Sequence, residues 1–380
     1  MSLQATALRT VDWAFTAAKT QGGPHGIHPY PAKFIPQIPR ALIGLMPPPK
    51  GTIVLDPFCG SGTTLVEAME AGYASVGIDL SPIACLIGKV KTTPLSERAI
   101  QTVRHVCAEA ERRLARKQFV VPEIPRVDHW FQPQVQAGLA SLLSAIADVE
   151  DTDTCDALRV ALSSIIVRVS NQDSDTRYAA VQKDVSADDV LNAFRQRAND
   201  VVLAAQSMSN GLRPRGAGPL IINQDILTVR PEQIRQPVGL VVTSPPYPNA
   251  YEYWLYHKYR MYWLGMDPVA VREKEIGARP HFFRGKNSHT ADHFLEQMSQ
   301  VFRLLAAVMH HKGSACFLIG RSIIRGETID NLALLRRAAT AHGFQLADKI
   351  ERQISRTRKA FNLSHAAIES EHIAVFRRAE

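Results

Sequence analysis

Four consecutive residues, Ser244, Pro245, Pro246 and Tyr247, join hydrogen-bond acceptors to an aromatic ring. Two successive prolines fix φ and donate no backbone N–H, so the carbonyl of Pro245 projects in a set direction beside the short hydroxyl of Ser244. The ring of Tyr247 offers a face on which a flat heterocycle can stack. An amino group on an aromatic base is a poor nucleophile, because its lone pair is delocalised into the ring. These acceptors are suited to holding its N–H groups and aiming the nitrogen at an electrophile, which is catalysis by positioning.

Two carboxylates and two glycines form a second set of candidate site residues. Asp56 ends the apolar run Thr52–Asp56. Asp79 ends a similar run roughly 20 residues later, the offset at which an acid meets ribose hydroxyls in dinucleotide-binding folds. Gly60 and Gly62 follow the first run and let the backbone approach a ligand closely. The loop has neither the G-x-G-x-x-G order nor the Gly-Lys-[Ser/Thr] end of a phosphate-binding loop, so the pattern does not indicate a phosphate site.

The elements that must position these residues are typical of an α/β domain interrupted by helices. Strand, loop, helix and strand between residues 52 and 79 predict a βαβ unit. Apolar residues then recur at helical spacing over about 97–210, where four successive helices without a strand are predicted. A further helix is predicted near the start of the chain, over Val11–Lys19. Later strands are predicted at 220–223, 239–243, 314–319 and 371–376.

The candidate site residues resemble the motifs of S-adenosylmethionine-dependent DNA amino-methyltransferases. The run from Leu55 to Thr64 resembles their motif I, and Ser244–Tyr247 resembles their motif IV, [Asp/Asn/Ser]-Pro-Pro-[Tyr/Phe/Trp]. The resemblance covers roughly residues 28–95 and 220–376. It implies a Rossmann-like class I methyltransferase sheet with an inserted helical domain, and S-adenosyl-L-methionine as the cofactor.

The motif order resembles the α permutation of these enzymes, in which the insert is the target-recognition domain. The predicted domains are therefore residues 1–96, which carry motifs X, I and II, the helical insert 97–215, and residues 216–380 with motif IV. Ser244, Pro245, Pro246 and Tyr247 would form the catalytic loop. The cofactor-binding residues implied by the resemblance are His28, Tyr30, Pro31, Lys33, Phe34, Asp56, Pro57, Phe58, Gly60, Gly62, Thr63, Thr64, Asp79, Leu80, Ser81, Asp225 and Ile226.

The resemblance implies methyl transfer to the exocyclic amino group of a flipped DNA base in a restriction-modification system, with a separate cognate restriction endonuclease as a possible partner. Serine in motif IV favours cytosine N4 over adenine N6. The alternatives left open are an adenine-N6 enzyme, an RNA guanine-N2 methyltransferase and a non-catalytic DNA-binding module. Carbon-5 cytosine methylation is excluded, because none of the five cysteines follows a proline as that chemistry's nucleophile does.

Composition and charge agree with a nucleic-acid partner. The formal net charge of +8 favours a polyanion, and Arg352, Arg356, Arg358 and Lys359 form a basic cluster expected to contact phosphates. A second basic stretch runs from Arg272 to Lys286. No metal is predicted, since His281, His289 and His293 are more typical of loop or surface histidines. The odd number of cysteines and the absence of a long apolar run predict a cytoplasmic protein with no membrane span.

Overall fold

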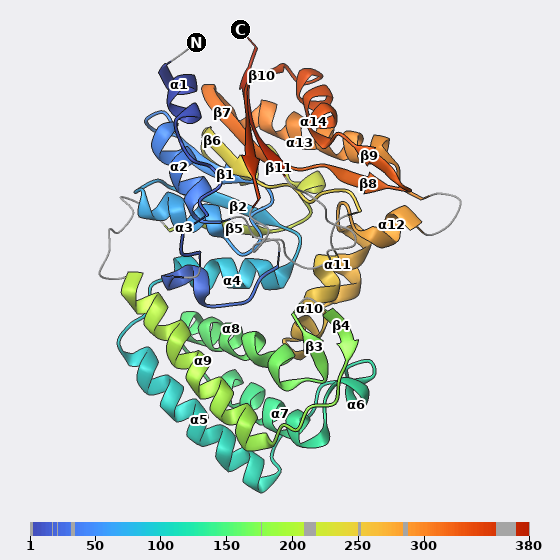
Figure 1. Cartoon of the computed structure of the whole chain (residues 1–380). Helices are drawn as coiled ribbons and strands as arrows, with labels where there is room; N and C mark the ends of the chain where they lie inside the picture. Colours follow the sequence, from blue (N-terminus) through green and yellow to red (C-terminus); the bar gives the residue numbers. More distant parts are fainter. Residues whose placement is uncertain are drawn as a thin grey trace.

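The computed structural model describes residues 3–16, 18–20, 22–31, 35–175, 177–208, 218–249, 252–283, 288–354 and 370–379. Its centre is a seven-stranded sheet in the order β10-β11-β7-β6-β1-β2-β5 (Figure 1). Neighbouring strands are parallel except β11, which runs antiparallel to both β7 and β10. The strands are β1 (Ile53–Asp56), β2 (Ser75–Asp79), β5 (Leu220–Asn223), β6 (Val238–Thr243), β7 (Met309–Ile319), β10 (Phe344–Gln353) and β11 (Ser370–Arg378). The predicted α/β class and sheet are confirmed.

Alternating side chains of the central strands enter two hydrophobic cores, one on each face of the sheet. Leu55 of β1 and Phe317 of β7 join the core under α13 (Ala291–Val308) and α14 (Asn331–Thr340). Val54 and Leu318 join the core on the other face, with α1 (Leu3–Arg9) and α2 (Gln37–Leu45). Every residue of β1 and β6 is buried, so these two strands form a fixed base for the loops that follow them.

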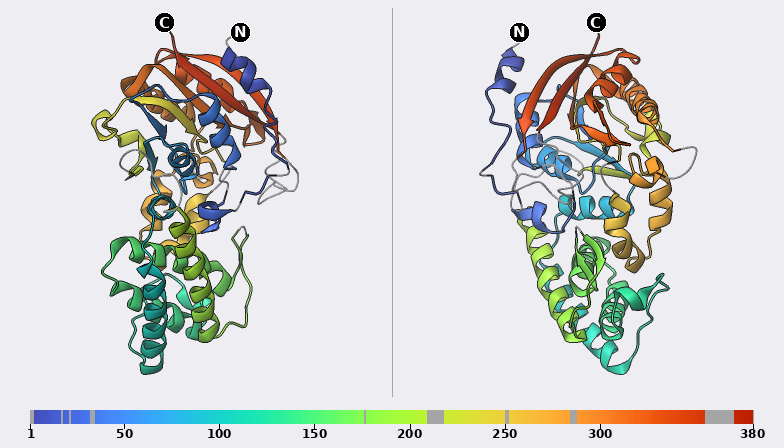
Figure 2. Two further views of the ribbon diagram at one scale, coloured as in Figure 1. Left: turned by 90° about the vertical axis from the view of Figure 1, so that its left-hand side faces the viewer. Right: turned by 45° about the vertical axis from the view of Figure 1, so that its right-hand side comes forward.

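The insert forms a second lobe below the sheet (Figures 1 and 2). It holds α5 (Arg98–Arg116), α6 (Val127–Trp130), α7 (Pro133–Ala147), α8 (Thr152–Val169) and α9 (Ala187–Ser207). A capping box begins α9, because Ser186 and Asp189 exchange hydrogen bonds there. The prediction of an insert without strands is wrong, since β3 (Gln172–Ser174) and β4 (Arg177–Ala180) pair as a hairpin.

One hydrophobic core joins the insert to the sheet domain. It contains residues of α5, α7, α8 and α9 together with α4 (Pro82–Thr92) and α10 (Tyr253–Trp263). Trp263 of α10 packs edge-on against Phe131 of the insert, and both are fully buried. The insert is therefore held firmly against the two helices that follow the candidate cofactor and catalytic loops.

The N-terminal helix lies earlier in the chain than predicted. It spans Leu3–Arg9, and the indole of Trp13 donates a 2.8 Å hydrogen bond to the carbonyl of Leu8 within a series of turns. Among the described residues no helix is long and apolar enough to cross a membrane. The remaining elements are η1 (Gly23–Gly26), α3 (Thr63–Glu70), η3 (Ile226–Thr228), η4 (Pro231–Gln233), α11 (Pro268–Lys274), α12 (Arg279–Phe283), β8 (Ser322–Ile324) and β9 (Glu327–Ile329).

Candidate active site

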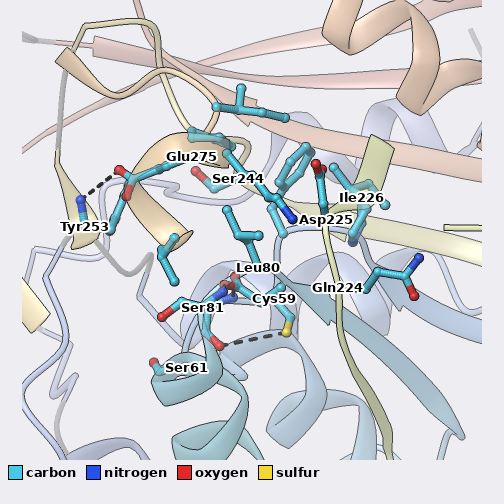
Figure 3. A pocket seen from close by; sticks show the side chains of 18 of the residues that line it. Cys59, Ser61, Leu80, Ser81, Gln224, Asp225, Ile226, Ser244, Tyr253 and Glu275 are labelled. Carbon is cyan, nitrogen blue, oxygen red and sulfur yellow. Dashed lines mark hydrogen bonds between the residues drawn. The ribbon is translucent and has the colours of Figure 1, made fainter. Parts of the chain in front are cut away.

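A pocket lies beyond the carboxyl ends of β1, β2 and β6, where ligands bind in open α/β sheets (Figure 3). Its void measures about 890 Å³, including the part open to solvent. The predicted residues that line it are Tyr30, Pro57, Phe58, Gly60, Thr63, Asp79, Leu80, Ser81, Asp225, Ile226, Ser244 and Pro246. Residues from the predicted cofactor loops and from the predicted catalytic loop thus meet in one cavity.

Asp56 lies behind the pocket wall and joins three elements. Its carboxylate accepts hydrogen bonds from Thr64 Oγ1 (2.6 Å), Thr243 Oγ1 (2.7 Å) and the backbone N–H of Phe58 (3.1 Å). Burial raises the pKa of this carboxyl to about 6, against the effect of those donors. Neither Asp56 nor Thr64 lines the pocket, so their predicted contact with the cofactor is corrected to a role in holding β1, α3 and β6 together.

The glycines of the first loop permit close backbone packing. Gly62 has φ +78°, and a Cβ there would lie 3.0 Å from the Cα of Gly88 in α4. Gly60, with φ +48°, presents its backbone to the pocket beside the ring of Tyr30. Gly62 therefore serves the packing of α3 on α4, and Gly60 is the glycine that reaches the cavity.

Asp79, at the end of β2, fixes two loops by their backbones. Its carboxylate accepts from the N–H of Gly60 (2.8 Å) and from the N–H of Ser81 (2.8 Å). Burial raises its pKa to about 6, although both donors favour the ionised form. The side chain also lines the pocket, so it can accept a hydrogen bond from a ligand hydroxyl.

The catalytic loop presents Ser244 and Pro246 to the pocket, whereas Pro245 and Tyr247 are buried behind it. The hydroxyl of Tyr247 lies 3.4 Å from the carbonyl of Leu318 and 3.2 Å from Glu371 Oε1. Its ring belongs to the core under α13. The prediction that this ring stacks on a base is therefore corrected, because the aromatic rings that line the pocket are those of Tyr30, Phe58 and Tyr253.

The proline-bearing segment predicted as motif X reaches the pocket through Tyr30. Its ring stacks on His257 of α10 at a centroid distance of 4.8 Å and faces Tyr253 at 6.5 Å. His28 is buried, with Nε2 2.9 Å from Ser163 Oγ, and burial lowers its pKa well below the usual value. His28 and Pro31 do not line the cavity. The predicted residues Lys33 and Phe34 lie outside the described part of the chain.

Asp225 and Ile226 line the pocket shortly after the end of β5. Asp225 Oδ1 accepts a hydrogen bond from the N–H of Leu227 (3.0 Å) and so begins the short helix η3. Ile226 is buried and joins the core on that face. An acid beside an apolar wall is suited to a flat ring that carries an amino group.

Sequence reasoning missed several residues of the pocket wall. They are Cys59, Ser61, Gln224, Tyr253, Val271, Lys274, Glu275 and Ile276. Glu275 is 7% exposed, and its carboxylate accepts from the N–H groups of Tyr253 (2.9 Å) and Trp254 (2.9 Å). No strand end or glycine loop marks this residue in the sequence. The chain turn between α11 and α12 brings it to the pocket.

Arg352, the first residue of the predicted basic cluster, is not free to contact DNA. Arg352 is 8% exposed, its Nη1 lies 2.8 Å from Glu371 Oε2, and its Nε donates to the carbonyl of Trp13. A buried guanidinium that is already paired has no free face for a phosphate. Arg356, Arg358 and Lys359 lie outside the described residues.

Four cations from three parts of the chain form what we call the cationic surface: Arg126 before α6, Lys258 of α10, and Arg272 and Lys274 of α11. The pKa of Lys258 in α10 is lowered by burial and by the charges of Arg126 and Arg272. Arg272 of α11 lies over the ring of Trp254 at 5.6 Å, and Lys274 lines the pocket. The cationic surface therefore extends from the insert to the pocket.

The three predicted non-ligand histidines lie against one another. The rings of His281 and His293 flank that of His289 at centroid distances of 4.9 and 4.7 Å. In the described part of the chain no cluster of histidine, cysteine, aspartate or glutamate is suited to hold a metal ion.

The sheet order, with its one antiparallel strand beside the edge, and the pocket at its carboxyl edge define a class I methyltransferase fold. Residues 9–89 match the N6/N4 methyltransferase family, described as DNA methylase. The chain is 28% identical over 249 residues to the Type II methyltransferase M.MvaI of Kocuria varians, which covers 61% of this chain and 55% of that protein. It is 24% identical over 373 residues to M.MjaII of Methanocaldococcus jannaschii, which covers 73% and 68%.

A shorter match links the chain to an RNA enzyme. Over 51 residues it is 41% identical to the tRNA (guanine(10)-N2)-dimethyltransferase of Methanocaldococcus jannaschii, which covers 13% of this chain and 14% of that one. The chain spans about half the length of M.MvaI and about two thirds of M.MjaII. Through residues 9–89 and these relatives, the chain is similar to S-adenosylmethionine-dependent DNA amino-methyltransferases, in agreement with the resemblance of its motifs.

Proposed function

We propose that this protein binds S-adenosylmethionine in the pocket and methylates the exocyclic amino group of a DNA base, with cytosine N4 as the favoured target. The observation that carries the proposal is the convergence of Asp79 and Ser244 in one cavity, because they come from the two motif loops. The Type II methyltransferases among its relatives support a role in restriction-modification, in which a separate cognate endonuclease would be the partner.

The residues present fit such a cofactor. Asp79 lines the pocket and would hold hydroxyl groups, the backbone at Gly60 borders the cavity without a side chain, and Ile226 with Asp225 would suit an amino-bearing ring. The bound cofactor would supply the electrophilic methyl group of a sulfonium. These residues would bind and orient it.

Ser244 would hold and aim the base. Its Oγ accepts one N–H of the amino group, so that the nitrogen lone pair is directed at the methyl carbon. In this transfer a C–N bond would replace the C–S bond of the sulfonium, whose electrons would stay on sulfur, and the amine proton would pass to water. Tyr30, Phe58 and Tyr253 offer the apolar and aromatic faces against which a base taken out of the helix can pack.

The cationic surface would bind the DNA backbone. Phosphate contacts supply affinity and salt dependence without sequence information. Its position between the insert and the pocket supports the further proposal that the insert, residues 97–215, reads the target sequence.

Radiolabelled methyl transfer tests the proposed function. The purified protein, incubated with labelled S-adenosylmethionine, is expected to label duplex DNA and to leave a tRNA pool unlabelled. A reversed preference would contradict the DNA substrate and favour the RNA alternative raised by the guanine-N2 relative. Cofactor binding without label in either nucleic acid would favour the non-catalytic module.

A further inference from the structure

The pocket gathers more acidic than basic side chains in a protein whose formal net charge is +8. Among the described residues that line it, the charged side chains are Asp79, Asp225 and Glu275 against Lys274. Lys274 is exposed, whereas Glu275 is nine-tenths buried. Three carboxyl groups that can ionise beside a cation, with one exposed ammonium, predict a ligand that brings positive charge.

Glu275 is held in place on both sides. Its carboxylate accepts from the first two N–H groups of α10, and the next residues pack on the catalytic loop. A Cβ at Gly277, where φ is +78°, would lie 2.7 Å from the carbonyl oxygen of Tyr247. The N–H of Asn249 donates to the carbonyl of Gly277 at 2.9 Å. The carboxylate is therefore fixed relative to Ser244, and Figure 3 shows both side chains in the same pocket.

The surroundings of Glu275 favour its neutral form when no cation is present. Burial raises its pKa to about 8, the charges of Glu252 and Asp79 act in the same direction, and the N–H groups of Trp254 and Tyr253 oppose them. Burial, together with the charges of Asp79 and Glu275, also raises the pKa of the Tyr30 hydroxyl well above its usual value. A cation in the pocket would favour loss of the proton from Glu275.

We propose that Glu275 is a counter-charge for the cationic cofactor, so that the pocket binds a sulfonium more tightly than the neutral thioether left after methyl transfer. The proposal rests on the proposed function, since it takes S-adenosylmethionine as the ligand. Methyl transfer removes the charge that attracts Glu275, which weakens the hold on the product. The residue would thereby favour exchange of spent cofactor for fresh.

Calorimetric titration of the whole protein with S-adenosylmethionine and with S-adenosylhomocysteine tests the proposal. In Glu275→Gln we expect the ratio of the two affinities at pH 8 to fall about tenfold, mostly through weaker binding of the sulfonium. The wild-type preference for the sulfonium should increase from pH 6.5 to pH 8 as Glu275 ionises, and the variant should lose that dependence. Glu273→Gln removes an exposed neighbouring carboxylate that does not line the pocket and should keep the wild-type ratio.

The outcomes separate this inference from the proposed function. If the wild-type protein binds neither ligand, the proposed function fails. If it binds both and Glu275→Gln weakens both equally, Glu275 acts only as a cap of α10 and the counter-charge is refuted. Thermal unfolding of each variant checks that the fold is intact, and Glu275→Asp, which keeps the charge on a shorter side chain, should retain part of the preference for the sulfonium.

Discussion

The pocket and the cationic surface beside it carry opposite charges. Asp79, Asp225 and Glu275 line the pocket. On the cationic surface, the charges of Arg126 and Arg272 act on Lys258, and Glu273 lies 3.8 Å from Arg272. The two regions meet at Lys274. This difference agrees with the proposal of two ligands of opposite charge, a cationic cofactor inside and a polyanion outside, with the predicted catalytic loop where they would meet.

The largest expected effect comes from Ser244 in the predicted catalytic loop. Ser244→Ala should lower methyl transfer by at least about 100-fold, because one acceptor for the developing charge on the amine is lost. Affinity for S-adenosylmethionine should change by less than about twofold, since the proposal assigns the Ser244 hydroxyl to the amine of the base and not to the cofactor. Turnover is measured by label incorporation and affinity by calorimetry. Retained turnover would show that Ser244 does not hold the amine.

A smaller effect is expected on the acidic side. Asp79→Asn removes the carboxylate that accepts from Gly60 and Ser81, so cofactor affinity should fall about tenfold or more. Asp225→Asn is the matched control, because it changes an acid of the same pocket that is anchored by one backbone donor, to Leu227. Equal losses of cofactor affinity in the two variants would contradict a larger contribution of Asp79 to cofactor binding.

On the cationic side the expected change is in salt dependence. Arg272→Gln should weaken DNA binding severalfold and reduce the slope of log affinity against log salt by about 1, with no change in sequence preference. Arg336→Gln, on the exposed face of α14, should leave the slope unchanged. Fluorescence anisotropy across a salt series measures both. An unchanged slope in Arg272→Gln would place the DNA elsewhere.

The smallest expected effect concerns stability and pH. The carboxyl of Glu275 has a pKa of about 8 in the folded protein and an ordinary value of 4.5. Between these values the folded protein keeps a proton that the unfolded chain has lost, so this group makes stability fall as pH rises. Glu275→Gln should therefore reduce the fall in Tm between pH 5 and pH 8 by about 3 °C. A steeper fall of Tm with pH in the variant than in the wild-type protein would contradict the raised pKa of Glu275.

The sequence predicted the parts of the site that follow strand ends. Asp56 and Asp79 end buried apolar runs, and Ser244 follows another, so local pattern was sufficient to find the loops after β1, β2 and β6. Pattern could not tell which side of each loop faces the ligand. Asp56 and Tyr247 proved to be buried supports, because their partners Thr243 and Glu371 lie far away in the chain.

The residues that were missed depend on contacts between distant segments. Glu275 reaches the pocket only because α10 and α11 fold back on the insert through a shared core. Arg352 looked like a phosphate contact until its strand placed it beside Glu371. The strands β3 and β4 were not predicted, because runs of three and four residues are too short to show an alternation of apolar and polar side chains.

Nucleoside mass spectrometry tests the central claim most directly. DNA incubated with the purified protein and S-adenosylmethionine is digested to nucleosides, beside an RNA control and the Ser244→Ala variant. The account predicts N4-methylcytosine in DNA that depends on Ser244. N6-methyladenine in DNA would keep the site and mechanism but contradict the cytosine target. Unmodified DNA with methylated RNA, or no modification at all, would contradict the claim that this pocket methylates DNA.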